Sequence, residues 1–116
     1  MAVHDSGTGD PVVFLHGDPA PSYLWRNVVP HVAGRARVVV PDLIGHGDSD
    51  ELDEPGPGSY TFVEHRRYLD DRGDRVTLAV HDWGSALGFD RANRRRGRWA
   101  GIAHTEAIVR PLTWAD

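Results

Sequence analysis

Three stretches of the sequence place polar, chemically active side chains directly after short apolar runs. They are His16-Gly17-Asp18-Pro19, His81-Asp82-Trp83-Gly84 and Thr105-Glu106. In an open parallel sheet, reacting groups lie just beyond the carboxyl ends of the strands. If the apolar runs form such a sheet, the three stretches meet at one edge. The candidate site residues are therefore Asp18, Asp82, Trp83 and Glu106.

The second stretch has the architecture of a nucleophile elbow, a sharp strand-to-helix turn that pushes its central side chain outward. Serine is usual at that centre, whereas this sequence has Asp82, with Gly84 allowing the helix to start close to the strand. The amide of Trp83 would lie at the helix N-terminus, where an anion is favoured. An aspartate there indicates attack by a carboxylate and an ester intermediate. The spacing is equally compatible with an Asp82 that only caps the helix.

The elements that must position these residues are predicted from apolar spacing and turn residues. We expect buried strands at 12–16, 38–40, 75–80 and 99–104, helices at 23–32, 61–71 and 84–96, and a long loop at 42–59. Alternation of strands and helices predicts an α/β fold, in which a parallel sheet of about four strands is covered by helices on both faces.

Local signals refine the helices. Ser22 is expected to cap the first helix, and Pro30 is expected to kink or shorten it because proline lacks the backbone donor of a helix interior. Thr61 and Glu64 have the spacing of a capping box at the start of the second helix. The third helix is expected to end at Gly97.

The composition limits the classes of function. A chain of 116 residues allows one domain, and the absence of cysteine excludes disulfides, thiolate metal sites and a cysteine nucleophile. No apolar run is long enough for a transmembrane helix, and the polar start shows no secretion signal. We therefore expect a cytoplasmic location, or the periplasm if residues precede Met1.

The net charge and the charged stretches of the sequence argue against several classes of partner. The net charge of −4 argues against nucleic acid, and the arginines at 94–98 are accounted for by their place at a predicted helix C-terminus. The acidic stretch at 48–54 does not have the spacing of an EF-hand loop. We expect no cofactor, no metal, no nucleic-acid partner and no membrane partner.

Residues 81–89, with the sequence HDWGSALGF, resemble the nucleophile motif of the haloalkane dehalogenases, which belong to the α/β-hydrolase superfamily. The likeness continues through 22–27, 41–45, 101–103 and 106–108, and it covers nearly the whole chain. It implies an α/β-hydrolase fold and cleavage of carbon–halogen bonds. The implied partners are a halogenated alkane or alkene, water and the released halide ion.

The resemblance also implies roles for the candidate residues. Asp82 matches the nucleophile that displaces the halide, and Trp83 matches the tryptophan whose indole N–H holds it. The backbone amides of Trp83 and Asp18 would form an oxyanion hole. Glu106 matches the acid that orients a catalytic histidine. Asp18 stands where the family usually has asparagine as the second halide ligand, and an ionised carboxylate there would repel the halide.

Two further departures from the family concern the region after the fourth predicted strand. In the family, a helical cap and a late histidine base come after this strand, and the 116 residues end before both places. We therefore expect residues 1–116 to be the N-terminal part of a core domain that lacks the base and cap and fails to complete turnover. We also expect association through open sheet edges.

Three alternatives stay open. An epoxide hydrolase also has a His-Asp-Trp-Gly elbow, although that family generally has an aromatic residue at the position of Asp18. A coelenterazine luciferase shares the fold and elbow. The chain is also compatible with a non-catalytic fragment or pseudoenzyme.

Overall fold

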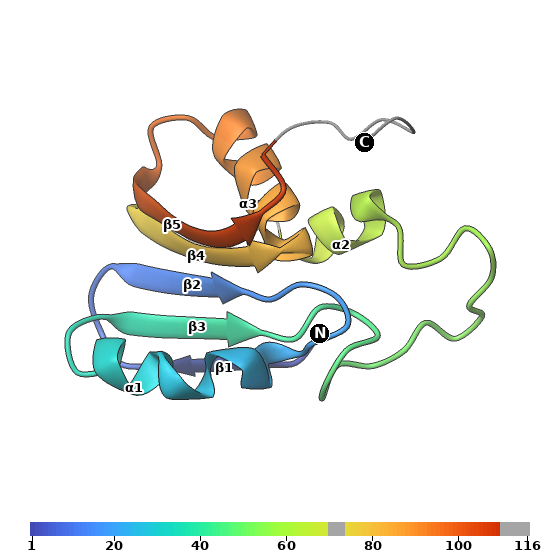
Figure 1. Ribbon diagram of the computed structural model, residues 1–116, viewed down its shortest axis with the longest axis horizontal. Coiled ribbons are helices and arrows are strands. Elements are labelled where there is room, and N and C mark those ends of the chain that lie inside the picture. The colour runs from blue at the N-terminus through green and yellow to red at the C-terminus, as the bar shows by residue number, and fades with distance from the viewer. Residues whose placement is uncertain (70–73, 110–116) are drawn as a thin grey trace.

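A five-stranded sheet with helices on both faces forms the centre of the molecule (Figure 1). The computed structural model describes residues 1–69 and 74–109. The strands are β1 (Val3–Ser6), β2 (Pro11–Leu15), β3 (Arg37–Pro41), β4 (Val76–Asp82) and β5 (Trp99–Ala107). Their order is β1-β3-β2-β4-β5; β1 runs antiparallel to β3, and all other neighbours are parallel. The predicted α/β class with a largely parallel sheet is confirmed.

The helical elements are the 3₁₀ helix η1 (Ser22–Asn27) and the α-helices α1 (Val29–Val32), α2 (Phe62–Leu69) and α3 (Trp83–Arg94). The segment between β3 and α2 contains no helix or strand, as predicted for 42–59. The predicted end of the second helix at Asp71 lies outside the described residues.

The strand β1 is an addition to the about four strands expected from the sequence. Its four residues read Val-His-Asp-Ser, so they lack the apolar run that indicates a buried strand. Antiparallel pairing with β3 holds it at the sheet edge, where Asp5 accepts a bond from Arg37 Nε at 2.8 Å. The formation of this polar edge strand therefore depends more on its pairing with β3 than on its own sequence.

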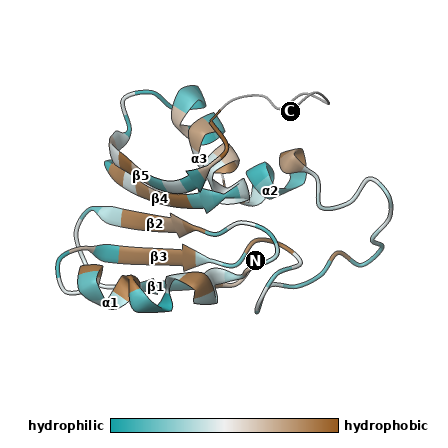
Figure 2. Ribbon diagram, viewed as in Figure 1, coloured by the Kyte–Doolittle hydropathy of each residue, from teal (hydrophilic) through white to brown (hydrophobic). Residues whose placement is uncertain are grey.

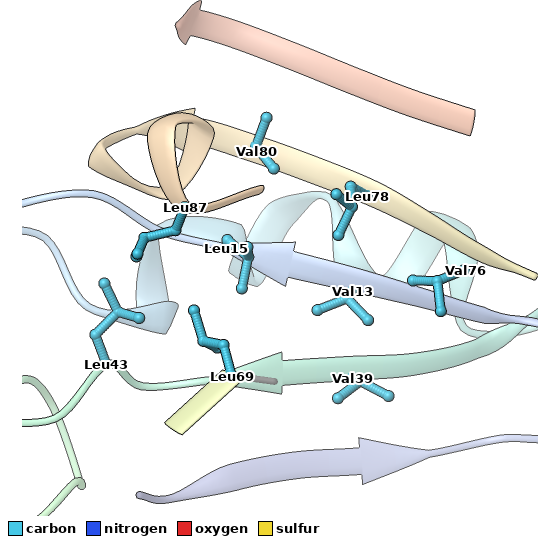
Figure 3. Packing of buried hydrophobic residues seen from close by; sticks show 9 residues of the cluster. All are labelled: Val13, Leu15, Val39, Leu43, Leu69, Val76, Leu78, Val80 and Leu87. Atoms are coloured by element: carbon cyan, nitrogen blue, oxygen red, sulfur yellow. The ribbon is translucent and has the colours of Figure 1, made fainter. Parts of the chain in front are cut away.

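The central strands bury side chains on both faces. Figure 2 shows that hydrophobic residues predominate along β2, β3 and β4. In β2, Val13 and Leu15 belong to one core, whereas Phe14 belongs to another that includes Trp25. The first core is closed by Leu69 of α2 and Leu87 of α3 (Figure 3). Because successive strand residues face opposite sides, the helices of the two cores lie on opposite faces of the sheet.

The first predicted helix is divided. Residues 22–27 form η1 and α1 follows as a single turn, with Pro30 in its first positions, where its missing N–H costs nothing. The prediction that Ser22 caps this helix is wrong, because Pro21 holds the cap position and no side-chain cap bond forms. The Ser22 N–H instead donates to Asp42 Oδ1 at 2.7 Å.

The remaining boundaries shift by a few residues. The capping box is confirmed, since Thr61 N donates to Glu64 Oε2 at 3.0 Å and Glu64 N donates back to Thr61 Oγ1 at 3.4 Å. Strand β4 extends two residues further than predicted, to Asp82, and β5 extends three further, to Ala107. Both extensions carry the sheet into the stretches that hold the candidate site residues.

Candidate active site

The backbone makes a tight turn with a positive φ at Asp82. Asp82 ends β4 with φ 49° and ψ −121°, and α3 begins at the next residue. A non-glycine residue at positive φ costs of order 1–3 kcal/mol and persists only where its surroundings enforce it. The turn here is enforced by close backbone approach, because a Cβ on Gly84 would lie 2.5 Å from the carbonyl oxygen of Leu15. The first turn of α3 therefore packs directly against the end of β2.

The Asp82 carboxylate is directed away from its own helix. No side-chain cap bond to α3 forms within the described residues, so the capping interpretation is not supported. Instead, the Asp18 N–H donates to Asp82 Oδ2 at 3.2 Å. Gly17 makes this approach feasible, because a Cβ at that position would lie 2.5 Å from the Asp82 Cβ. The ends of β2 and β4 thus meet through one backbone amide and one carboxylate.

A pocket of about 580 Å³ lies in front of this contact. Its lining residues are Asp18, Gly45, His46, Tyr60, His65, Asp82 and Trp83. Three of the four predicted site residues, Asp18, Asp82 and Trp83, are thereby brought together. The Trp83 ring is further held by an edge contact with Phe62 of α2, with ring centroids 6.0 Å apart.

Glu106 takes a different position. The register between β4 and β5 shifts after His81, so that Asp82 pairs with Ala107 and Glu106, with φ 46°, has no direct partner on β4. A bulge of this kind redirects a side chain beside a strand end. The Glu106 carboxylate lies 3.2 Å from His81 Nε2 and does not line the pocket.

Ser85 ties the elbow to the chain beyond β5. Its buried hydroxyl donates to the Asp82 carbonyl oxygen and accepts from the Ile108 N–H at 2.8 Å. The turn that presents Asp82 and the bulge that presents Glu106 are therefore mechanically linked. Ser85 was not among the residues predicted for the site.

His46 is a second residue that was not predicted for the site. Its Nε2 lies 3.0 Å from Asp18 Oδ1, and its Nδ1 lies 3.3 Å from the Ile44 carbonyl oxygen. The signal available was its place in the loop after β3, a fourth strand end at the same edge of the sheet. From the sequence, the end of β3 is predicted only as part of a long acidic loop.

A group of buried polar residues, which includes His16 and Asp42, lies behind the pocket and supports it. His16 Nδ1 donates to the Gly17 carbonyl oxygen at 2.7 Å, and Leu43 N donates to His16 Nε2 at 2.9 Å. Each ring nitrogen thus has one role, which is the pattern of a neutral imidazole. Burial lowers the pKa of His16, in agreement with this assignment.

Asp42 lies next to His16 and is also satisfied by backbone donors. The Ser22 N–H binds its Oδ1, and the Asp48 N–H binds its Oδ2 at 2.9 Å. Burial would raise the pKa of Asp42, but these amides outweigh it and hold the pKa below its usual value. The Asp42 carboxylate therefore connects the chain around Ser22 to the chain around Asp48.

Among the described residues, no group of three or more His, Cys, Asp or Glu side chains is arranged to hold a metal ion. In the same part of the chain, no helix is long and apolar enough to cross a membrane.

Known protein families share this arrangement of strands and helices. The model of the alpha/beta hydrolase fold family matches residues 10–107, which include every strand except β1 and every described helix. The chain belongs to the alpha/beta hydrolase family. The matched residues include the strand-to-helix turn at Asp82.

Within the alpha/beta hydrolases, the chain is similar to several haloalkane dehalogenases. The enzyme of Sphingobium indicum is 60% identical over 122 residues, covering 100% of this chain and 41% of the relative. That of Mycolicibacterium smegmatis is 56% identical, covering 100% of this chain and 39% of the relative. The chain therefore spans about two-fifths of the length of these relatives.

The fold of this chain is also similar to that of a solved haloalkane dehalogenase structure. The haloalkane dehalogenase DatA from Agrobacterium tumefaciens superimposes with a TM-score of 0.84 at 36% identity, covering 95% of this chain and 38% of DatA. The resemblance to haloalkane dehalogenases is confirmed as homology.

Proposed function

We propose that this alpha/beta hydrolase cleaves carbon–halogen bonds with Asp82 as the nucleophile. A carboxylate oxygen of Asp82 forms a bond to the sp³ carbon of a halogenated alkane. The carbon–halogen bond breaks, and the halide leaves with the bonding electron pair. The product is an alkyl ester of Asp82. The observation that carries this proposal is the presentation of Asp82 at a positive-φ elbow, uncapped and facing a pocket.

The groups around Asp82 suit both stages of the reaction. The departing halide is a diffuse anion that the indole N–H of Trp83 can stabilise without transferring a proton. Hydrolysis of the ester then develops negative charge on the carbonyl oxygen. The Asp18 N–H, 3.2 Å from Asp82 Oδ2, is placed to stabilise that charge, and the Trp83 amide is its proposed partner in an oxyanion hole.

Hydrolysis of the ester also needs a general base, which is typically worth about 10²–10⁴ in rate. We propose that Glu106 orients the histidine that serves as this base. Within the described residues, Glu106 contacts His81, and His16 is buried with both ring nitrogens engaged. We accordingly propose that residues 1–116 by themselves form the ester and hydrolyse it too slowly for sustained turnover.

The test offers 1,2-dibromoethane to the 116-residue chain and measures bromide release and intact mass. We expect about one equivalent of bromide and a covalent adduct that peptide mapping places on Asp82. Styrene oxide is offered in parallel, and a hydroxyalkyl adduct on Asp82 or diol formation would favour the epoxide hydrolase alternative. If neither substrate modifies the chain, the non-catalytic alternative holds. Sustained bromide release would contradict the proposal that residues 1–116 hydrolyse the ester too slowly for turnover.

The sheet edges support a second proposal, which concerns association. Within the described residues, β1 and β5 each have a strand neighbour on one side only, and Ile102 of β5 is exposed. Unpaired backbone donors and acceptors at an edge promote pairing with another chain. We propose self-association through these edges, and a purely monomeric sedimentation profile at high concentration would contradict it.

A further inference from the structure

We propose that His46, paired as a cation with Asp18, is a positioning residue that cancels the charge of Asp18 beside the nucleophile. The inference rests on the proposed function, because the charge matters where a halide leaves Asp82. It concerns a residue pair in the pocket wall and leaves the roles of Asp82 and Trp83 unchanged.

The first step is the hydrogen bonding of His46. Its two ring nitrogens face two acceptors, Asp18 Oδ1 at 3.0 Å and the Ile44 carbonyl oxygen at 3.3 Å. A neutral imidazole has one N–H donor and one acceptor, so it cannot satisfy both oxygens. An imidazolium has two donors and satisfies both, which makes the contact with Asp18 an ion pair.

The second step is the surroundings of His46. The rings of His16 and His65 lie 5.2 and 6.1 Å away, centroid to centroid, and Tyr60 and Asp82 face it across the pocket. Burial lowers the pKa of both His16 and His65, and a charge on His46 lowers it further. Among the described residues, His46 is the one of these three histidines whose two ring nitrogens both lie near an acceptor: His16 has one donor and one acceptor as partners, and Nδ1 of His65 has no partner.

The third step is the charge of the pocket. Asp18 and Asp82 both line the pocket, so a departing halide would meet two carboxylates. A protonated His46 offsets one of them. The side chain of Asp18 is 70% exposed, whereas that of His46 is only 17% exposed, so solvent screens the pair in part. A partly screened pair of this kind is expected to change the rate about fivefold.

The test measures the rate of Asp82 alkylation by 1,2-dibromoethane at pH 6 and pH 8, followed by intact mass. Four chains are compared: wild type, His46→Gln, Asp18→Asn, and the double variant. We expect His46→Gln to slow alkylation about fivefold at pH 6. At pH 8 we expect Asp18→Asn to exceed wild type. At that pH we also expect His46→Gln to have no effect in the Asp18→Asn background, because an imidazole without a carboxylate partner is largely neutral.

The double variant separates charge compensation from a merely structural role. If His46 only supports the fold, its replacement slows alkylation at pH 8 even in the Asp18→Asn background, and the proposal is overturned. Equal rates for wild type and Asp18→Asn at pH 8 overturn it as well.

A second measurement does not depend on the reaction. In the histidine-¹⁵N-labelled chain at pH 6, with the His46 signals assigned by their loss in His46→Gln, both ring nitrogens should carry protons. A singly protonated His46 ring at that pH contradicts the ion pair. A chain that shows the imidazolium but no alkylation with any variant would contradict the proposed function and leave the pair itself supported.

Discussion

Two carboxylates stand at the ends of strands of the same sheet, and they are used in opposite ways. Asp42 follows β3, is only 6% exposed, and accepts backbone N–H bonds on both oxygens. Asp82 ends β4, accepts one longer backbone bond, and faces a pocket of about 580 Å³. The backbone strain lies at Asp82, whose φ is positive.

The difference shows how one type of side chain serves two purposes. A carboxylate that is fully satisfied by fixed amides has little tendency to attack carbon, and it contributes to the stability of the loops that it joins. A carboxylate with one weak donor keeps free lone pairs, and presenting it in a strained turn lowers the stability of the fold. We infer that Asp42 is a structural residue and Asp82 is the reactive one.

The largest expected effect is the loss of chemistry on replacing Asp82. Asp82→Asn should abolish adduct formation with 1,2-dibromoethane, because an amide oxygen is a far weaker nucleophile. Its urea midpoint should be close to that of wild type, since asparagine has the same size and its Oδ1 can still accept the Asp18 N–H. Intact mass and urea unfolding measure the two quantities. A destabilised Asp82→Asn chain would show that Asp82 is also structural and would break the comparison.

The next largest effect concerns the close approach that forms the elbow. A Cβ on Gly84 would lie 2.5 Å from the Leu15 carbonyl oxygen, and backbone atoms cannot move aside cheaply. Gly84→Ala should therefore lower the free energy of unfolding by about 3 kcal/mol and slow the alkylation of Asp82. Gly34→Ala is the matched control, because its added Cβ meets nothing within 4 Å. Equal urea midpoints for the two variants would contradict the tight turn.

The third effect tests the structural carboxylate. Asp42→Asn keeps the size of the side chain but turns an NH₂ group toward one of the two backbone N–H donors, from Ser22 and Asp48. The loss of one charged hydrogen bond should cost about 2 kcal/mol in urea unfolding. The folded variant should still form the Asp82 adduct. An Asp42→Asn chain that is stable but unreactive would place Asp42 in the reaction and overturn the assignment.

Much of this comparison could be anticipated from the sequence. Residues such as Val13 and Leu15 indicate a buried strand because apolar side chains continue on both faces, and the elbow follows from the strand-to-helix change around Asp82. The family resemblance supplied the role of Asp82. The structural role of Asp42 could not be anticipated, since its donors are the backbone amides of Ser22 and Asp48, which any residue type could provide.

The features that were not predicted depend on long-range contacts. Ser22 looks like a helix cap by type, but its N–H is used by a carboxylate 20 positions away. His46 lies in an acidic loop, and that composition does not indicate its contact with Asp18, 28 positions earlier. Strand β1 is polar and exists through its pairing with β3. Local patterns reveal apolar periodicity, whereas these contacts arise only when the sheet brings distant loops together.

The smallest expected effect is a pH dependence of stability that comes from the buried histidines His16 and His65. Burial lowers their folded-state pKa, so the unfolded chain binds more protons once the pH falls below about 6.5. Stability should therefore decrease from pH 7.5 to 5.5, by at most about 1.4 kcal/mol for each histidine. The carboxylate of Asp42 titrates at lower pH and does not contribute in this window.

His16→Gln separates this contribution, because an amide side chain can both donate to Gly17 and accept from Leu43 without titrating. Urea unfolding of His16→Gln at the two pH values should show a smaller difference than wild type. The exposed His31→Gln chain is the control and should keep the wild-type difference. If His16→Gln kept that difference as well, His16 would be protonated in the folded chain. The assignment of a neutral His16 imidazole that positions Leu43 and Gly17 behind the pocket would then be wrong.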